Sequence, residues 1–242
     1  MSPFRMLFTK KLKRSYPAFA EKYGVEFTEL PFIRIEAWAD HDRQVEEITH
    51  DAVLVFTSVN AVTFFVGQHK SLEGFLLYTL DGSTRQEAEK YFQKGQVLGT
   101  ANNAVMLARL IIRERKAEEV FFICGNLRRN ELPEMLKKAG VRVSEIIVYQ
   151  TTLVPQAVAG EFDGVAFFSP SAVESFFINN HPGPATIYFS IGSTTSRALR
   201  GYTGNTIITA GTSSEESLLE ALENYLVSKN ESDEQVIFQC FQ

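Results

Sequence analysis

The sequence predicts an internally duplicated α/β protein built on parallel β-sheets. Short β-rich runs alternate with stretches of helical apolar spacing, and this alternation is typical of βαβ units whose helices cover both faces of a sheet. Three segments also recur at a constant separation of 111 residues. In both copies these segments carry Ser- and Thr-rich turns at the point where a predicted strand ends and a predicted helix begins.

Nine strands are predicted from short runs of apolar and β-branched residues. In chain order they are Met6–Phe8, Ala52–Phe56, Phe75–Leu80, Val97–Gly99, Val120–Cys124, Val143–Val148, Val165–Phe168, Thr186–Ser190 and Thr206–Thr209. Helical spacing between them is clear in Asn103–Arg115 and Ser214–Val227. The chain has 242 residues, 45% of them hydrophobic, which is enough for two domains of ordinary size.

The recurring segments are the basis for predicting a duplication. They pair "FTSVNAV" at Phe56–Val62 with "FFSPSAV" at Phe167–Val173, "LDGSTR" at Leu80–Arg85 with "IGSTTS" at Ile191–Ser196, and "VLGTANNAVML" from Val97 with "IITAGTSSEESL" ending at Leu218. One match could arise by chance, but three matches in the same register indicate a repeated unit.

Composition excludes several classes of function. The net charge of −5 argues against a nucleic-acid partner, because no broad basic stripe is available to neutralise phosphates. No apolar run approaches the length of a membrane span and no charged-then-apolar leader follows Met1, so we expect a soluble, cytoplasmic protein. The cysteines Cys124 and Cys240 and the four histidines form no metal-ligand spacing, and the glycine motifs of nucleotide-binding loops are absent, so no cofactor is expected.

The repeated turns indicate an anion site. In a parallel sheet, ligands bind beyond the carboxyl ends of the strands, where helix N-termini favour carboxylates and phosphates. The spacing of Ser171 and Glu174 predicts a capping box, with Asn60 as the equivalent cap in the first copy. The alternative is that these residues simply begin helices, as every α/β protein requires. Two basic clusters, Thr9–Arg14 and Asn126–Arg129, either attract an anionic ligand or are solvated surface.

Four strings, in this order and spacing, resemble the uroporphyrinogen-III synthase family. They are "DAVLVFTSVNAVTFF", "ICGNLRRNELPEMLKKAGVRVSEIIVYQT", "VAFFSPSAVESFF" and "IGSTTSRAL". The resemblance extends from about Met6 to Leu226, and its most specific parts are Cys124–Thr151 and the last two strings.

The resemblance implies two flavodoxin-like parallel-sheet domains joined by a two-stranded linker. One domain would be discontinuous, combining residues 1–31 with 155–242, and the other would be the inserted segment 37–147. The linker strands would be residues 32–36 and 148–154. The two copies would then exchange their first strands, so that the repeated turns become opposite walls of one cleft.

The activity that the resemblance implies is cyclisation of hydroxymethylbilane to uroporphyrinogen III, with loss of water and inversion of the terminal pyrrole ring. The family uses neither a metal nor an organic cofactor. The expected partner is the linear tetrapyrrole, handed over by the preceding synthase, and a monomer is expected. The alternative is a non-catalytic two-domain binding or regulatory protein for an anionic small molecule.

Site residues are carried over by position. Tyr149 matches the family's tyrosine, proposed to assist departure of the hydroxyl. Side chains expected to bind substrate carboxylates are Ser58, Thr84, Ser169 and Thr195, aided by the backbone N–H groups of Asn60, Ser171 and Ala172. The alternatives are that Tyr149 only packs in the linker and that Thr195 only preserves its turn.

This chain departs from the family pattern in the first copy. Lys10 and Lys11 follow Thr9 where Arg-Pro is frequent, which keeps the charge but removes the planar fork of arginine. Asp81 replaces a frequent glycine, and Val59 replaces a frequent proline. The contacts of the first copy are therefore less firmly predicted than those of the second.

Overall fold

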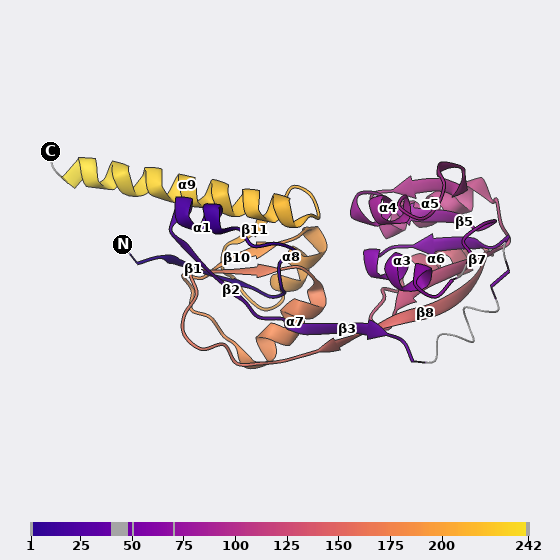
Figure 1. Cartoon of the computed structure of the whole chain (residues 1–242), viewed down its shortest axis with the longest axis horizontal. Coiled ribbons are helices and arrows are strands. Elements are labelled where there is room, and N and C mark those ends of the chain that lie inside the picture. Colours follow the sequence, from indigo (N-terminus) through magenta and orange to yellow (C-terminus); the bar gives the residue numbers. More distant parts are fainter. Residues whose placement is uncertain (1, 40–47, 50, 70, 241–242) are drawn as a thin grey trace. The chain divides into compact units, whose positions relative to one another are not determined.

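The fold is described from a computed structural model that covers residues 2–39, 48–49, 51–69 and 71–240, without the side chains of residues 230–240 (Figure 1). The chain divides into two compact units. Unit 1 combines Met1–Arg34 with Thr152–Gln242, and unit 2 is the continuous segment Ile35–Thr151.

Unit 2 contains a sheet with the strand order β3-β8-β7-β4-β5-β6. Its strands are β3 (Ile33–Ala37), β4 (Val53–Phe56), β5 (Leu76–Leu80), β6 (Val97–Ala101), β7 (Glu119–Gly125) and β8 (Arg142–Leu153). Its helices are α3 (Val59–Val66), α4 (Ser83–Ala88), α5 (Ala104–Glu114) and α6 (Glu131–Lys138), with a 3-10 turn, η1 (Lys94–Gln96).

Unit 1 contains a sheet with the strand order β11-β10-β9-β1-β2. Its strands are β1 (Phe4–Phe8), β2 (Val25–Glu29), β9 (Gly164–Phe167), β10 (Ile187–Ser190) and β11 (Ile207–Thr209). Its helices are α1 (Pro17–Tyr23), α7 (Pro170–Asn179), α8 (Ser193–Leu199) and α9 (Glu215–Cys240).

The chain passes from unit 1 to unit 2 along β3 and returns along β8 (Figure 1). Backbone hydrogen bonds join Trp38 to Val148 and Phe32 to Val154. Residue numbers therefore rise along one strand as they fall along the other, so these two strands are antiparallel. Among the described residues, the other neighbouring strands within each sheet, such as β4 with β5 and β9 with β10, pair in parallel.

The parallel α/β fold in two domains is confirmed. Unit 1 has the flavodoxin-like strand order 2-1-3-4-5 when its strands are numbered along the chain. In unit 2, the strands β8-β7-β4-β5-β6 are arranged in the same way, but the first of them in the chain is β4, which occupies the place that β9 has in unit 1. The registers also repeat: Val53 pairs with Leu76 in one sheet, and Gly164 pairs with Ile187 in the other, each 111 residues later.

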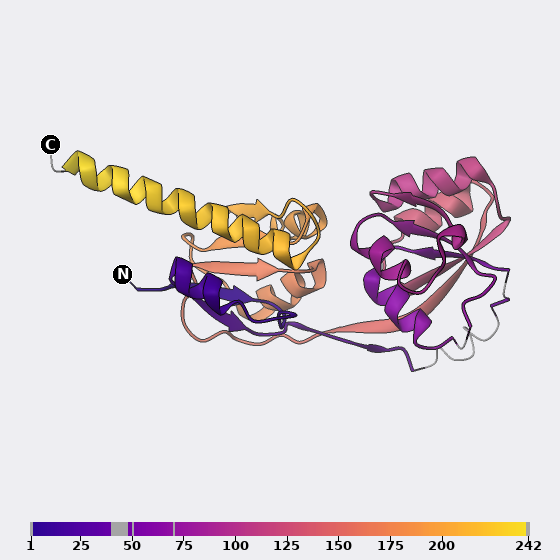
Figure 2. The same cartoon turned by 45° about the horizontal axis from the view of Figure 1, so that its top comes forward.

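Each sheet is covered on both faces by helices (Figure 2). In unit 2, Leu54 and Phe56 of β4 pack with α3, whereas Val53 and Val55 pack with the cluster that includes α5 and α6. All four β4 side chains are thus buried, which explains why this strand is a continuous apolar run. Burying each large apolar side chain contributes about 1.5–3 kcal/mol.

Unit 1 is layered in the same way. Phe167 and Tyr188 pack with α7 and α8 on one face of the sheet, and Met6 and Phe189 pack with α9 on the other. The sequence did not predict β2, whose residues Val-Glu-Phe-Thr-Glu carry two charges. It lies at the sheet edge and pairs with β1, so both of its glutamates remain exposed to solvent.

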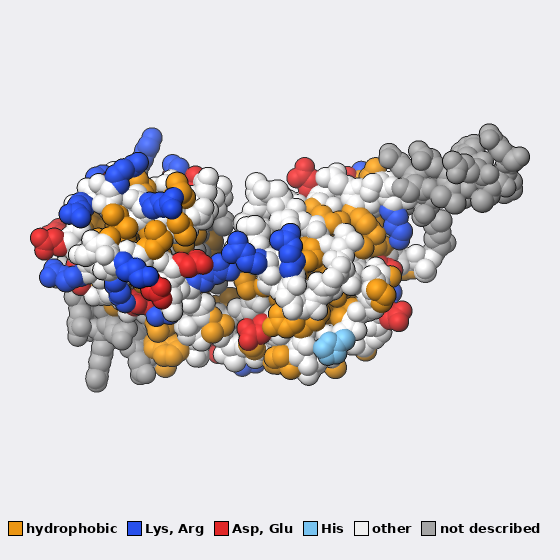
Figure 3. All heavy atoms as spheres, turned by 180° about the vertical axis from the view of Figure 1, so that it is seen from behind, with side chains coloured by type: hydrophobic (Ala, Val, Ile, Leu, Met, Phe, Trp, Pro, Cys, Tyr) orange, Lys and Arg blue, Asp and Glu red, His pale blue; other side chains and the backbone are white. Residues whose placement is uncertain are grey.

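Within the described part of the chain, no helix has both the length and the apolar character needed to cross a membrane. Basic side chains on the face drawn in Figure 3 are dispersed among acidic and neutral ones.

Candidate active site

The predicted site residues lie where parallel strands end. In unit 2, Ser58 and Asn60 follow β4, Thr84 follows β5, and Tyr149 is the last β8 residue paired with β7. Because β4, β5, β7 and β8 run parallel, these positions share one edge of the sheet. In unit 1, Ser169, Ser171 and Ala172 follow β9, and Thr195 follows β10.

Tyr149 and Ser58 are brought into direct contact. The Tyr149 Oη donates a hydrogen bond of 3.2 Å to Ser58 Oγ, which also accepts the Asn60 N–H at 3.2 Å. The Tyr149 ring stacks on Phe64 of α3 with ring centroids 5.7 Å apart. In both of these bonds Ser58 Oγ is the acceptor.

Burial raises the pKa of Tyr149, while the hydrogen bond to Ser58 partly offsets that rise. The phenol is therefore protonated at neutral pH and carries a proton at the strand edge.

The N-caps of α3 and α7 are Ser58 and Ser169, so the predicted caps Asn60 and Ser171 are wrong. Ser58 and Ser169 have extended backbone conformations, with φ of −147° and −159°, as cap residues require. Pro170 then occupies the first position of α7, where its missing N–H costs nothing. Ser171 is already helical, so the predicted capping box with Glu174 does not form at the helix start.

Two of the three backbone donors predicted for substrate already have partners. Asn60 N–H donates to Ser58 Oγ, and Ala172 N–H donates to Ser169 Oγ at 3.1 Å. An incoming carboxylate would share these donors or meet the serine hydroxyls themselves.

Thr84 and Thr195 are more buried than a ligand-binding residue needs to be. Their exposed fractions are 5% and 2%. Gly82 precedes Thr84 with φ of +77°, a left-handed conformation that glycine adopts without strain and that turns the chain from β5 into α4. Because both threonines are buried, they offer a ligand only a narrow surface.

Lys10 is held by a buried carboxylate. Its Nζ lies 2.8 Å from Glu215 Oε2 and 4.4 Å from the centroid of the Phe168 ring. Glu215 is 4% exposed and also accepts the Lys13 N–H and the Tyr16 hydroxyl. Burial alone would raise the pKa of Glu215, but Lys10 and these hydrogen bonds outweigh it and lower the pKa.

The charge of Asp81 is likewise balanced. Arg85 Nη1 lies 3.5 Å from Asp81, and Arg85 Nε lies 2.7 Å from Glu89. The departures from the family pattern at Lys10 and Asp81 are thus each accompanied by a nearby partner of opposite charge. Sequence reasoning missed Glu215, because an acidic residue at a helix start usually faces solvent.

Unit 1 also contains a chain of three hydroxyl groups that sequence reasoning missed. Ser196 Oγ lies 2.5 Å from Ser190 Oγ and 2.7 Å from Thr209 Oγ1. Ser190 and Ser196 are buried, and Thr209 reaches the surface. The three side chains tie α8 to the ends of β10 and β11.

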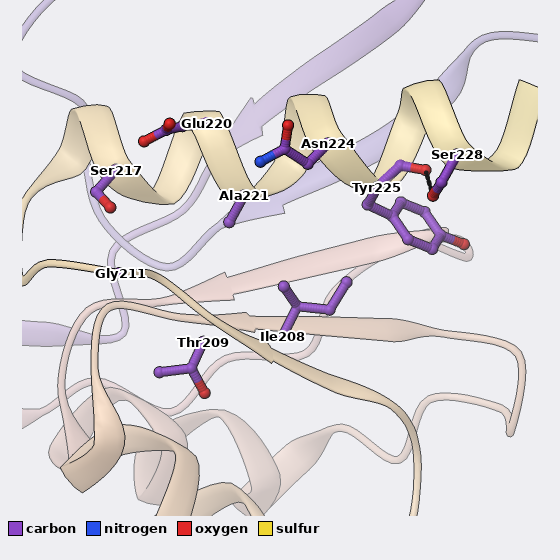
Figure 4. A pocket seen from close by; sticks show the side chains of 9 residues that line it. All are labelled: Ile208, Thr209, Gly211, Ser217, Glu220, Ala221, Asn224, Tyr225 and Ser228. Carbon is purple, nitrogen blue, oxygen red and sulfur yellow. Dashed lines mark hydrogen bonds between the residues drawn. The ribbon is translucent and has the colours of Figure 1, made fainter.

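Thr209 also lines a pocket of about 500 Å³ between β11 and α9 (Figure 4). Its polar lining includes Ser217, Glu220 and Asn224 of α9. None of the predicted site residues is among its lining residues, so this pocket is separate from the candidate site.

Among the described residues, no cluster of three or more His, Cys, Asp or Glu side chains is arranged to hold a metal ion. His41 and His50, considered in the sequence, lie outside the described residues. Cys124 is buried at the end of β7, and burial raises the pKa of its thiol to about 12.

Two parallel α/β units with hydroxyl-bearing turns after their strands define a two-domain protein of the class that binds ligands at strand ends. A family model described as uroporphyrinogen-III synthase HemD matches residues 15–229. The chain therefore belongs to the uroporphyrinogen-III synthase family, whose members cyclise hydroxymethylbilane, a linear tetrapyrrole, in haem biosynthesis. It is a cyclising lyase of that pathway.

Solved structures of this family have the same fold. A mutant uroporphyrinogen III synthase from the extreme thermophile Thermus thermophilus is 18% identical, with a TM-score of 0.66 over 93% of this chain and 99% of that one. The enzyme from Helicobacter pylori 26695 is 15% identical, with a TM-score of 0.63 over 92% and 99%. A search of curated proteins found no match.

Proposed function

We propose that Tyr149 assists the departure of the terminal hydroxyl of hydroxymethylbilane, and that Ser58 and its counterparts bind the substrate's carboxylates. The observation that carries this proposal is the hydrogen bond from Tyr149 Oη to Ser58 Oγ at the carboxyl edge of the unit 2 sheet. It places an acidic proton beside a hydroxyl group that can orient the substrate.

The proton balance is favourable. Loss of the hydroxyl leaves hydroxide, whose conjugate acid is water with a pKa of about 15.7. A phenol, with an ordinary pKa of about 10, is a much stronger acid than water, so proton transfer to the departing oxygen is downhill. When the substituted carbon of the last pyrrole attacks, its original bond to the methylene bridge must break, and the bridge rejoins the ring at the unsubstituted α-carbon, which inverts the ring. That α-carbon then loses its proton, which returns to the phenolate. Overall, only water is lost.

The remaining task is control of conformation. Departure of water leaves a reactive azafulvene, and the enzyme must direct attack from the substituted carbon of the last ring, because the free bilane closes to the type I isomer. In the proposal, Ser58, Thr84, Ser169 and Thr195, with the backbone N–H groups of Asn60, Ser171 and Ala172, hold carboxylates so that this attack is favoured.

Hydroxyl and amide donors suit an acidic protein. With a net charge of −5, the chain would bind the polyanion through local donors and helix N-termini rather than through excess positive charge. Arg129 and Leu127 follow Asn126 at the same edge of unit 2, and both are exposed. Arg128 is already paired with Glu145, so local attraction of the Asn126–Arg129 cluster for an anion would rest on Arg129.

Three further expectations belong to the proposal. The two units would correspond to the family's discontinuous domain, residues 1–31 with 155–242, and its inserted domain, residues 37–147. The protein would act as a monomer in the cytoplasm. It would receive hydroxymethylbilane from the preceding synthase.

The decisive experiment supplies bilane from the preceding enzyme and separates the porphyrin isomers after oxidation. We expect the type III isomer to dominate, at a rate above that of the reaction without this protein. If the type I isomer dominates at the uncatalysed rate, the proposal is wrong. Tight binding of the bilane without turnover would instead identify the alternative, a binding or regulatory protein.

A further inference from the structure

Tyr149 reaches Ser58 because β8 contains a bulge directly before it. Along β7 and β8, Cys124 pairs with Ile147, but the next residue, Gly125, pairs with Tyr149. Val148 is thus an extra residue in β8 at the end of the paired segment. A bulge of this kind changes the face toward which the following side chain points.

The two cores of unit 2 show the effect of the bulge. Ile146 and Val148 pack in the cluster that contains α3, and Ile147 packs in the cluster on the other face of the sheet. Strict alternation would send Tyr149 to the same face as Ile147. Instead Tyr149 packs against the α3 cluster, beside Phe64 and Ser58.

Gly125 leaves room for the redirected ring. A methyl group built at Gly125 would lie 2.5 Å from Tyr149 Cε2 and 2.9 Å from Tyr149 Oη. Both distances are too short for carbon contacts, so any side chain at Gly125 would displace the ring or move the strand. The absence of a Cβ here is required by the close approach of Tyr149.

Asn126 holds the strand on the other side of the bulge. Its backbone N–H donates to the Tyr149 carbonyl at 3.2 Å. Its side-chain Oδ1 accepts the Thr151 N–H at 2.8 Å, and its Nδ2 donates to the Thr151 carbonyl at 3.3 Å. The amide group of Asn126 thereby continues the hydrogen bonding of β8 where the regular register to β7 has been lost.

We propose that Gly125 and Asn126 are positioning residues for Tyr149. Gly125 provides the space for its ring, and the Asn126 amide fixes the bulged segment that aims the ring at Ser58. A catalytic effect of these residues rests on the proposed role of Tyr149 as a proton donor. Their effect on the orientation of the ring does not depend on that role.

The test uses the full chain labelled with 3-fluorotyrosine. The ¹⁹F resonance of Tyr149 is assigned by its absence in Tyr149→Phe. We expect Asn126→Ala to shift or broaden this resonance and to lower kcat severalfold, by no more than Tyr149→Phe does, with KM changed less than about threefold. The double variant with Tyr149→Phe should be no slower than Tyr149→Phe alone, because Asn126 acts through Tyr149.

A matched control is Asn180→Ala in unit 1. The Asn180 amide makes three bonds, one more than the Asn126 amide: it accepts from the Val158 N–H at 2.8 Å and donates to the carbonyls of Gln156 and Phe176 at 2.9 and 2.8 Å. Its loss should lower stability to a similar degree and leave the Tyr149 resonance and kcat unchanged. Gly125→Ala is a second variant, which fills the space that the Tyr149 ring occupies. It should shift the same resonance if it folds.

Each outcome has a distinct meaning. An unchanged Tyr149 resonance in Asn126→Ala, or additive losses of kcat in the double variant, would overturn the positioning role. If the resonance shifts but Tyr149→Phe has wild-type turnover, the positioning role is supported, and it is the proposed function of Tyr149 that fails.

Discussion

Tyr149 and Ser58 lie 91 positions apart in the sequence, and a single hydrogen bond of 3.2 Å joins them at one edge of the unit 2 sheet. Ser58 is the N-cap of α3, so its side-chain oxygen both caps this helix and accepts the hydrogen bond from the phenol of Tyr149. Ser58 therefore has a structural role as a helix cap and a proposed role in substrate binding.

Tyr149→Phe tests this pair directly. We expect kcat to fall at least severalfold while the melting temperature changes little, because the ring and its stacking on Phe64 are kept. Turnover is measured with enzymatically supplied bilane, and the type I fraction should rise. Tyr188→Phe, in the core of unit 1, is the control, and its kcat should be unchanged. Wild-type turnover in Tyr149→Phe would remove Tyr149 from the mechanism.

Thr195→Val should reduce activity more than Cys124→Ala. Valine keeps the volume of Thr195 but removes the hydroxyl that is proposed to bind substrate, at a position only 2% exposed. Cys124→Ala leaves a small cavity in the core of unit 2 and removes a thiol that burial keeps protonated. Both rates are measured at saturating bilane. The reverse order would show that the unit 1 site has been placed wrongly.

Glu215→Gln should lower the free energy of unfolding by about 2 kcal/mol at pH 7, since Lys10 and two hydrogen bonds lose their anionic partner. The pKa of Glu215 is below its ordinary value of 4.5 in the folded protein. Its contribution is therefore present above that ordinary value and is lost as the pH falls through the lowered folded pKa.

Urea titrations at several pH values measure this effect. The difference between wild type and Glu215→Gln should shrink as the pH falls from 7 toward 3. Glu216→Gln changes an exposed neighbour and should have little effect at any pH. A difference that is constant with pH would contradict the assignment to the charged form of Glu215.

Ser196→Ala should destabilise unit 1 by about 1–3 kcal/mol, because it leaves the fully buried hydroxyl of Ser190 without its 2.5 Å partner. Thermal unfolding followed by circular dichroism measures the loss. Ser193→Ala, at the exposed first position of α8, is the matched control. Equal stabilities for the two variants would mean that the hydroxyl chain contributes nothing.

The predicted strands were found because most of them are buried on both faces and therefore appear in the sequence as short apolar runs. Val53–Phe56 is the clearest case. The edge strand β2 was missed for the opposite reason, since its two glutamates lie on a partly solvated edge. The predicted N-caps lie two residues too late, because a cap is set by the backbone conformation. The capping-box spacing favours Ser171, which has Glu174 three residues later, whereas the extended residue that caps α7 is Ser169.

The sequence predicted individual site residues but not the contacts between them. The sequence places Tyr149 and Ser58 near strand ends, yet the contact between them depends on the bulge at Val148. "IIVYQT" begins as a continuous apolar run with no alternation that a bulge could interrupt, so the bulge leaves no mark on the sequence. The pairing of Glu215 with Lys10 was equally inaccessible, because it joins a helix start to a loop near the other end of the chain.

The assembly of unit 1 from both ends of the chain determines the order in which the protein can fold. Unit 2 is continuous and is complete once Thr151 has been synthesised. β1 pairs with β9, where Met6 lies beside Gly164, so this pair cannot form until β9 has been synthesised. The loop that the pair closes then contains nearly all of the chain made so far, and closing so long a loop is slow. Until then, the apolar residues of β1 are exposed on the ribosome without their second partner strand. Truncation after unit 2 would therefore leave the inserted domain with an N-terminal segment in which β1 has β2 but not β9 beside it.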